Sequence, residues 1–454
     1  MTSSDHNSVD IFDEDETMKN STLTRRQFLR GLTATAAAFT IVPSHVLASR
    51  RSVPPSEKLN IACIGVGGMG ASDVQSVSTE NIVALCDVDQ KHAAGTFNRY
   101  PNARKYSDFR IMLEKEDKNI DAVTVSTPDN LHAVAAMAAL KMGKHVYCQK
   151  PLCHDIFEVR SLTEEARKQK AVTQMGIQIH AEQTVKLAVE IIKSGVIGKV
   201  HKVDIFSNKN WGGGARPTDT PAVPETLNWD LWLGPAPYRP YHPTYLPGQW
   251  RRWWDFGTGT LGDMGCHIID PVWWALDLTY PTSVEANPGP FNEDTYPEAT
   301  VIRWEFPARG ELPPLTLTWC DGANRPPRPP ELEEGRNLPG QGSVYYGEKG
   351  TLMAPHMGNP RLIPESSMRT AKLPEPFLER GINHYQDWIR GCKGGPKPSA
   401  NFDYAGPLTE TILLGNIAAK ASQKIEWDAK NLKITNIPEA NKLLKRNYRQ
   451  GWHL

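Results

Sequence analysis

Short apolar runs alternate with helical segments along the first part of the chain. Each run has the length of one buried strand, and segments with helical periodicity separate the runs. Strands that alternate with helices in this way form parallel βαβ units. The pattern therefore predicts an α/β domain with a parallel sheet over residues 57–179. The runs cover Leu59 to Ile64, Ile82 to Leu85, Ala122 to Val125, His145 to Tyr147 and Val172 to Ile177.

The pattern changes after residue 180. A helix is expected from about Gln183 to Lys193, and beyond it polar and apolar residues alternate between loops rich in Pro and Gly. One further helix is expected to begin near Gly259 and to run toward Trp274. This pattern predicts an α+β domain with a mostly antiparallel sheet over residues 180–425. Its β-like runs cover Val200 to Phe206, Val301 to Phe306, Leu315 to Cys320 and Val344 to Tyr346.

The last part of the chain gives a weaker pattern. A helix is expected from about Thr409 to Ser422, followed by a basic C-terminal tail over residues 426–454. We expect this tail to pack on the second domain.

Length and charge narrow the class of protein. A chain of 454 residues exceeds one ordinary hydrophobic core, so two domains with a site between them are expected. Lys plus Arg and Asp plus Glu both number 51, which leaves no basic excess to attract nucleic acid or an anionic membrane surface. The 7 cysteines are dispersed and lack the paired spacing of a zinc site. We expect them to be mostly reduced and structural.

Glycines follow the first apolar run directly, as G-V-G-G-M-G at residues 65–70. In a dinucleotide-binding Rossmann domain, Gly65 would permit the tight turn, Gly67 would let the backbone approach a pyrophosphate, and Gly70 would allow close helix packing. Asp87 ends the second run, where its carboxylate can accept hydrogen bonds from a ribose. Its charge would repel a 2′-phosphate, which favours NAD over NADP. The alternative is that these glycines merely cap a strand.

Polar residues follow the later apolar runs as well. Since the carboxyl ends of parallel strands lie along one edge of the sheet, these residues are expected to converge on one crevice. The predicted cofactor-binding residues are Gly65, Gly67, Gly68, Met69, Gly70, Asp87, Thr127, Pro128, Asn130, His132, Gln149, Lys150 and Gln178.

The N-terminal residues resemble a twin-arginine export signal. T-R-R-Q-F-L-R at residues 24–30 precedes a weakly apolar run from Gly31 to Val42, and Val46 and Ala48 suit cleavage after Ala48. The run is too short for a stable membrane span. We expect residues 1–48 to comprise a disordered N-terminus and this signal, so that the twin-arginine machinery exports the folded protein to the periplasm or another extracytoplasmic space. The alternative is an amphipathic helix with two chance arginines.

One Lys and an Asp/His pair are the candidate catalytic residues. Lys150 lies in Q-K-P at residues 149–151, and Asp263 and His267 lie four residues apart on one helical face. Over about residues 58–280 the sequence resembles the Gfo/Idh/MocA oxidoreductase family, which combines a Lys in E-K-P with D-x-x-x-H on a helix. The resemblance implies that Lys150, Asp263 and His267 are the catalytic group. It also implies a homo-oligomer built through the second-domain sheet.

The chemistry of these residues agrees with that assignment. Oxidation of a secondary alcohol needs a proton acceptor, and His267 has the ordinary pKa nearest neutrality. Lys150 would stabilise negative charge on the substrate oxygen, and Asp263 would orient the imidazole or a second hydroxyl. The alternatives are a surface Lys and an ordinary helical pair. A metal site with Cys266 lacks further ligand spacing, so no metal is expected.

One position departs from the family pattern. The Glu that usually precedes the Lys is Gln149 here, which cannot act as a carboxylate base and is expected to leave Lys150 without an adjacent ion partner. Aromatic and Arg side chains suit the apolar faces and hydroxyl rims of sugars, although core packing or an oligomer interface is the alternative. The candidates are Trp211, Trp229, Trp232, Trp250, Arg251, Arg252, Trp253 and Trp254.

Together these features predict an exported oxidoreductase that acts on a sugar, polyol or glycoside. Because free NAD is scarce outside the cytoplasm, the cofactor is expected to be tightly held and recycled within the site. Two other classes stay open. One is an NAD-dependent glycosidase that works by transient oxidation and elimination, against which Gln149 argues mildly, and the other is a non-catalytic sugar-binding relative.

Overall fold

A computed structural model describes residues 57–454 of the chain. The predicted export signal and its cleavage position after Ala48 lie outside the described residues. Within residues 57–454, no helix combines the length and apolar character needed to cross a membrane.

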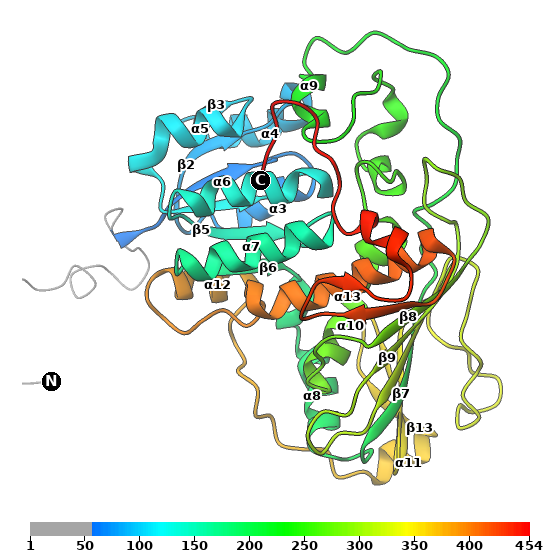
Figure 1. The fold of residues 1–454 in the computed structure, drawn as a ribbon. Coiled ribbons are helices and arrows are strands. Elements are labelled where there is room, and N and C mark those ends of the chain that lie inside the picture. The colour runs from blue at the N-terminus through cyan, green and yellow to red at the C-terminus, as the bar shows by residue number, and fades with distance from the viewer. Residues whose placement is uncertain (1–56) are drawn as a thin grey trace, which may run out of the picture. The chain divides into compact units, whose positions relative to one another are not determined.

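A six-stranded parallel sheet forms the first domain, with strand order β3-β2-β1-β4-β5-β6 (Figure 1). This confirms the predicted Rossmann-like sheet. The edge strand β3 was not predicted, because its three residues are exposed or half-buried and form no apolar run. The strands are β1 (Asn60–Ile64), β2 (Asn81–Cys86), β3 (Arg104–Tyr106), β4 (Ala122–Val125), β5 (His145–Gln149) and β6 (Thr173–Gly176).

Helices cover both faces of this sheet. Side chains alternate along a strand, so Ala62 and Ile64 of β1 pack among the residues of α5, α6 and α7, while Ile61 and Cys63 pack with α3, α4 and α12. A sheet buried on both faces explains the continuous apolar runs. The helices are α3 (Met69–Ser76), α4 (Gln90–Arg99), α5 (Phe109–Glu116), α6 (Asp129–Lys141), α7 (Ile156–Lys168) and α12 (His384–Cys392).

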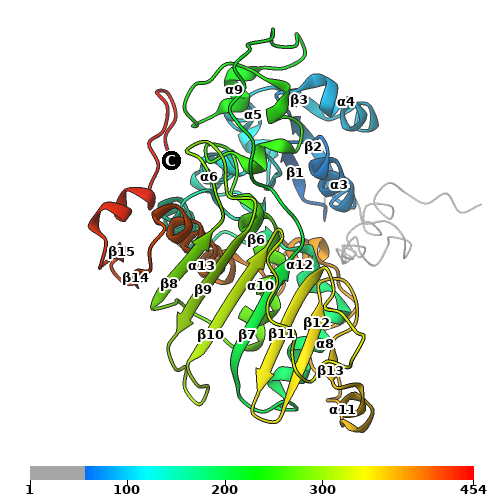
Figure 2. The same cartoon turned by 90° about the vertical axis from the view of Figure 1, so that its right-hand side faces the viewer.

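The second sheet has nine strands in the order β13-β12-β11-β7-β10-β9-β8-β14-β15, which Figure 2 shows side by side. Among its pairings in the described residues only β7 with β10 is parallel, which confirms the mostly antiparallel prediction. The strands are β7 (Val200–Ser207), β8 (Ser283–Pro288), β9 (Thr300–Phe306), β10 (Leu315–Asp321), β11 (Gln341–Gly347), β12 (Gly350–Pro355), β13 (Arg361–Ile363), β14 (Ile425–Asp428) and β15 (Lys433–Ile434).

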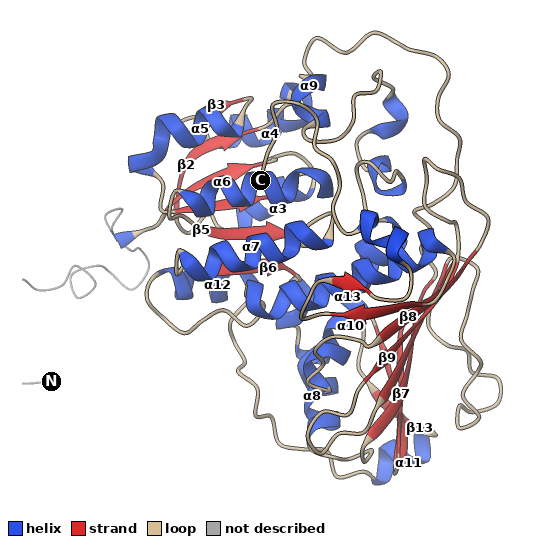
Figure 3. Cartoon of the chain, viewed as in Figure 1, coloured by secondary structure: helices blue, strands red, loops and turns tan. Residues whose placement is uncertain are grey.

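Three long helices lie between the two sheets. Figure 3 shows α8 (Gln183–Lys193), α10 (Gly259–Ala275) and α13 (Phe402–Ala421) on the face of the nine-stranded sheet that is turned toward the parallel sheet. Helix α10 contacts both α8 and α13, and these two contacts hold α10 in place beside the first domain. Two short helices complete the fold, α9 (Trp229–Leu233) and α11 (Glu365–Thr370).

Three features differ from the sequence-based prediction. Helix α13 begins at Phe402, capped by the Asn401 side chain, well before the predicted Thr409, because Pro407 lies inside the helix and hid its first turns. The second half of the chain holds more than the one further helix expected, and α12 packs on the parallel sheet. The tail follows the prediction only in part: β14 and β15 extend the nine-stranded sheet of the second domain, as expected, but the last residues bind α6 and α7 of the first domain.

All 7 cysteines are free thiols, and six of them are buried. The burial of these side chains supports a structural role for them. Burial is the largest cause that raises the pKa of each thiol, to about 12 for Cys63 and about 11 for Cys320.

Candidate active site

A cavity of about 690 Å³ lies at the carboxyl ends of the parallel strands. The loops after β1, β2, β4, β5 and β6 contribute to its lining, and α10 closes it from the side of the second domain. The predicted residues that it brings together are Gly65, Gly67, Gly68, Met69, Asp87, Thr127, Pro128, Gln149, Lys150, Gln178, Asp263 and His267.

The glycine turn between β1 and α3 leaves no room for side chains. Gly65 has φ 74°, and a Cβ there would lie 2.6 Å from the carbonyl oxygen of Ser126. A Cβ at Gly70 would lie 1.9 Å from the carbonyl oxygen of Gly65, so Gly70 supports the turn without lining the cavity. The backbone can therefore approach a bound phosphate at the start of α3, as a dinucleotide requires.

Asp87 holds this turn in place and faces the same cavity. Its Oδ2 accepts hydrogen bonds from the backbone N–H of Val66 (2.8 Å) and of Gly67 (3.2 Å), and its Oδ1 accepts one from Asp89 (2.9 Å). Burial raises the pKa of Asp87, and these bonds oppose the rise. A carboxylate has about four acceptor positions, so one is left for a ribose hydroxyl.

A buried hydroxyl in the lining also fits a ligand. Thr127 Oγ1 is shielded from solvent and has no hydrogen-bond partner among the described residues. Buried polar atoms are nearly always satisfied by protein, water or a bound molecule. The glycine cradle, the Asp87 carboxylate and this hydroxyl together fit a dinucleotide.

Two predicted cofactor residues do not reach the cavity. Asn130 is fully buried, and its side-chain amide donates to the carbonyl oxygen of Leu233. The His132 ring bridges the carbonyl oxygens of Thr127 (2.9 Å) and Pro151 (2.7 Å). Neither residue lines the cavity, and both ring nitrogens of His132 contact backbone carbonyl oxygens, so the structure gives no support to the prediction that these two residues bind the cofactor. His132 instead holds together the loops that follow β4 and β5.

Lys150 and Asp263 form an ion pair across the two domains. Lys150 Nζ lies 2.5 Å from Asp263 Oδ1 and 2.8 Å from the Asp263 carbonyl oxygen, and both side chains are 13% exposed. Lys150 therefore has an ion partner, contrary to the expectation based on Gln149. The remaining acceptor positions of Asp263 take hydrogen bonds from Arg251 Nε (2.8 Å) and Trp211 Nε1 (2.8 Å).

The pKa of Asp263 follows from these contacts. Burial favours the neutral acid, but Lys150 and Arg251 outweigh it and hold the pKa well below its usual range. Among the described residues no hydrogen bond joins Asp263 to His267. The carboxylate therefore positions Lys150, and the expectation that it orients the imidazole is not supported.

His267 lies one helical turn beyond Asp263 and lines the same cavity. Burial, then the charges of Lys150 and His356, lower the pKa of His267 well below its ordinary value. The ring is therefore neutral near pH 7, and its Nδ1 has no hydrogen-bond partner among the described residues. Its neighbour Cys266 is fully buried and does not line the cavity.

Gln149 is bound to a buried carboxylate on another element. Its Nε2 donates to both oxygens of Asp73 on α3, at 2.9 Å and 3.1 Å, and Asp73 is fully buried. Asp73 also accepts hydrogen bonds from Ser126 Oγ (2.6 Å) and the Tyr385 hydroxyl (2.6 Å). A Glu at position 149 would face this carboxylate directly, which explains why an amide stands before Lys150.

The aromatic candidates divide into two groups. Trp232, Trp250 and Arg251 line the cavity, and Trp211 binds Asp263. Trp229 and Trp253 are buried in an aromatic cluster, and Trp254 packs on Tyr296 with ring centroids 3.6 Å apart. For this second group the alternative of core packing is the correct one.

Sequence reasoning missed several residues of the cavity. Asp129 begins α6, and burial raises its pKa to about 7 against a hydrogen bond from Thr258. His92 lies against the glycine turn, and His356 lies 5.8 Å from His267 between ring centroids. Asp129 was within reach, because it follows the β4 run directly. His356 and His92 carry no motif that would have shown them.

Residues 59–177 match the family model of the Gfo/Idh/MocA oxidoreductases described as the NAD-binding Rossmann fold, and residues 181–310 match the model of their C-terminal alpha/beta domain. The chain is 28% identical over 152 residues to myo-inositol 2-dehydrogenase of Thermotoga maritima, covering 33% of this chain and 45% of that protein.

Two further similarities cover more of the chain. Levoglucosan dehydrogenase of Pseudarthrobacter phenanthrenivorans is 24% identical over 225 residues, which are 47% of this chain and 50% of that protein. The chain thus matches about half the length of these relatives. The structure of the WlbA dehydrogenase of Bordetella pertussis with NADH and UDP-GlcNAcA superposes with a TM-score of 0.59 at 16% identity, over 82% of this chain and 99% of that one. That likeness concerns the fold.

The Gln149–Asp73 pair yields a stability prediction. Gln149→Glu places a second carboxylate against Asp73 in a buried site, and we expect the free energy of unfolding to fall by about 3 kcal/mol. Adding Asp73→Asn restores an amide–carboxylate pair, so the double variant recovers at least half of the loss in urea unfolding.

Gln178→Glu is the matched control, because the Gln178 amide lies 3.1 Å from the Tyr385 hydroxyl and contacts no carboxylate. It is expected to change stability by less than about 1 kcal/mol. If Gln149→Glu lowers the free energy of unfolding equally with and without Asp73→Asn, the contact with Asp73 is not the reason that residue 149 is Gln.

Proposed function

The chain belongs to the Gfo/Idh/MocA oxidoreductase family, and we propose that it transfers a hydride between a tightly bound NAD and a secondary hydroxyl of a sugar, polyol or glycoside. One observation carries the proposal. The paired Lys150 and Asp263 and the neutral His267 line the same cavity as the glycine turn and Asp87.

Each residue has a distinct role in this reaction. The neutral imidazole of His267 accepts the proton of the substrate hydroxyl. The ammonium group of Lys150, fixed by Asp263, donates a hydrogen bond to the same oxygen and stabilises its developing negative charge. Arg251 and Trp250 at the wall of the cavity contact the sugar ring, whose C–H faces suit an indole. The nicotinamide supplies the hydride acceptor when NAD is bound.

Several properties of the protein are part of the proposal. We propose that the twin-arginine signal exports the folded, NAD-loaded enzyme to the periplasm and that the enzyme works as a homo-oligomer built through the nine-stranded sheet. Tight binding of NAD follows from that location, because nucleotide lost there is not readily replaced. The inositol and levoglucosan dehydrogenases to which the chain is similar support this substrate class.

Purified protein provides the direct test. Denaturation is expected to release NAD or NADH in near-stoichiometric amount, and mixing the holo-protein with a panel of sugars and polyols is expected to change the absorbance of bound reduced nicotinamide. A supernatant without nucleotide would count against tight binding. Release of aglycone from chromogenic glycosides without net nicotinamide reduction would indicate a glycosidase.

Variants at the two reacting groups test their roles. Lys150→Met and His267→Asn are each expected to lower kcat by roughly 10²- to 10⁴-fold with little change in bound nucleotide. Lys193→Met is the control, because Lys193 pairs with Asp277 on the surface. Undiminished turnover in both site variants would refute the assigned chemistry.

The lowered pKa of His267 predicts the pH profile. Only the neutral imidazole accepts a proton, so kcat/KM for alcohol oxidation falls as pH drops through the pKa of His267. Because that pKa lies below the ordinary 6.5, the acid limb is expected below pH 6.5. Asp129, which lines the same cavity and has its pKa raised to about 7, could also give a limb nearby, and Asp129→Asn removes it. A limb at or above pH 6.5 that persists in Asp129→Asn contradicts His267 as the base.

Asp87 is expected to select NAD. Asp87→Ser removes a charged acceptor, so the dissociation constant for NAD should rise roughly 10- to 100-fold while the discrimination against NADP shrinks. The measurement is titration of nucleotide-stripped protein with both cofactors. Asp121→Ser is the control, since the Asp121 carboxylate accepts a hydrogen bond from the Asn60 backbone (2.8 Å) and does not line the cavity. Unchanged discrimination in Asp87→Ser would assign specificity elsewhere.

A further inference from the structure

The last residues of the chain lie against the first domain. Figure 1 shows the red segment leaving the region of α13, passing α9 and ending beside α6. The backbone N–H of Phe157 at the start of α7 donates to the Leu444 carbonyl oxygen (3.0 Å), and Lys141 at the end of α6 donates to Leu454 (3.0 Å). We call residues 444–454 the tail segment.

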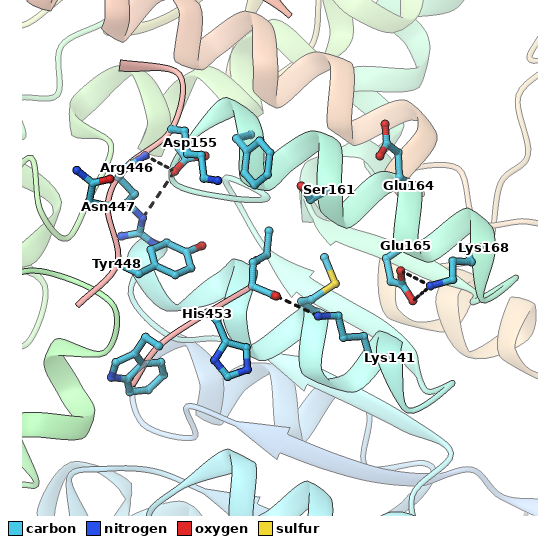
Figure 4. Close-up of a pocket in the computed structure, with 15 residues that line it drawn as sticks. Lys141, Asp155, Ser161, Glu164, Glu165, Lys168, Arg446, Asn447, Tyr448 and His453 are labelled. Atoms are coloured by element: carbon cyan, nitrogen blue, oxygen red, sulfur yellow. Dashed lines mark hydrogen bonds and ion pairs between the residues drawn. The ribbon is translucent and has the colours of Figure 1, made fainter. Parts of the chain in front are cut away.

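A half-buried arginine fixes where the tail segment begins. Arg446 donates from Nε (2.8 Å) and from its terminal nitrogen (2.6 Å) to Glu158 Oε1, and its terminal nitrogen also reaches the Asn130 carbonyl oxygen (2.6 Å). The Tyr448 hydroxyl donates to the same Glu158 oxygen (2.6 Å), and Glu158 is 1% exposed. Figure 4 shows Arg446 and Tyr448 beside Asp155, over a cavity on the outer side of α6 and α7.

A second arginine fixes the middle of the tail segment. Arg449 pairs with Asp230 of α9, donates to the Gly234 carbonyl oxygen (3.0 Å), and accepts a turn-forming hydrogen bond from the Trp452 backbone (3.1 Å). The contacts of Arg446 and Arg449 therefore fix the chain near α9, and the turn after Arg449 directs Trp452 toward α5.

Trp452 then enters the wall of the cofactor cavity. Its ring lies 6.1 Å from that of Phe109 at the start of α5, and the Arg110 guanidinium lies 4.4 Å from the indole centroid. Trp452 lines the same cavity as Gly65 and Asp87. The Trp452 side chain is half-buried, although it belongs to the tail segment, which reaches the first domain from the second.

The position of Trp452 within the cavity identifies the part of the bound cofactor that its indole would contact. Asp87 follows β2 and marks the ribose, while Phe109 follows β3, the neighbour of β2 on the side away from Lys150. Leu131 of α6 lines the cavity as well. Trp452 therefore stands at the adenosine end, opposite to the reacting groups, where the ligand presents a flat aromatic base.

We propose that Trp452 forms the outer wall of the adenine site and that the tail segment acts as a clasp that slows the loss of NAD. The proposal rests on NAD being the cofactor, as proposed above. An indole offers a large π face to adenine without reading its identity, and stacking of a base on an aromatic ring survives in water. The Arg110 guanidinium on the indole holds the ring in its orientation.

Exchange of bound NAD tests the clasp. Holo-protein is mixed with excess isotopically labelled NAD, and the rate at which bound nucleotide becomes labelled is followed. Trp452→Ala is expected to speed exchange about tenfold, since one base–aromatic contact is lost, and Trp452→Phe is expected to stay within about threefold of the wild-type rate. Arg449→Ala, which changes no residue of the cavity, is expected to speed exchange by loosening the tail segment.

His453→Ala is the matched control, because His453 is the exposed neighbour of Trp452 and does not line the cofactor cavity. Thermal unfolding of each variant checks that the fold is kept. The inference is overturned if Trp452→Ala exchanges bound NAD at the wild-type rate. It is also overturned if Trp452→Phe exchanges bound NAD as fast as Trp452→Ala does. Wild-type protein that binds no NAD would refute the proposed cofactor instead, so the two failures are distinguishable.

Discussion

One ion pair joins the two domains at the centre of the cavity. Lys150 directly follows β5 of the parallel sheet and Asp263 lies in the first turns of α10, so their contact of 2.5 Å links the sheet edge to the helix. Both charges are largely removed from solvent, where an unpaired charge is costly. The two charges are therefore stable only as a pair. Because His267 lies one turn further along α10, the helix places it in the same cavity.

The charges around this pair also set the protonation of its neighbours. Lys150 and Arg251 place two positive groups beside the single negative charge of Asp263. Burial, followed by the charge of Lys150, lowers the pKa of His267 and keeps the ring neutral, and the two cations favour an oxyanion in the cavity. A neutral acceptor next to a fixed cation is the combination that removal of a proton from an alcohol requires. The same side chains thus serve the architecture of the interface and its chemistry.

The sequence predicted local features well and long-range partners poorly. Apolar runs located β1, β4 and α10, and the D-x-x-x-H spacing placed Asp263 and His267 on one face, because periodicity depends only on neighbours along the chain. The partner of Gln149 was out of reach, since Asp73 comes from another element and carries no motif of its own. His132 shows a related limit: a polar residue after a strand can serve a backbone carbonyl as readily as a ligand, and both ring nitrogens of His132 contact backbone carbonyl oxygens.

The burial of the cysteines bears on where and when the chain can fold. The thiolate is the species that attacks a disulfide, and burial suppresses it at every one of the 7 positions. In the folded protein the thiols therefore react slowly with oxidants that join thiols, whereas an unfolded chain would present all of them at once. Folding in a reducing compartment therefore protects the chain from mispaired disulfides in any oxidising environment that it meets afterwards.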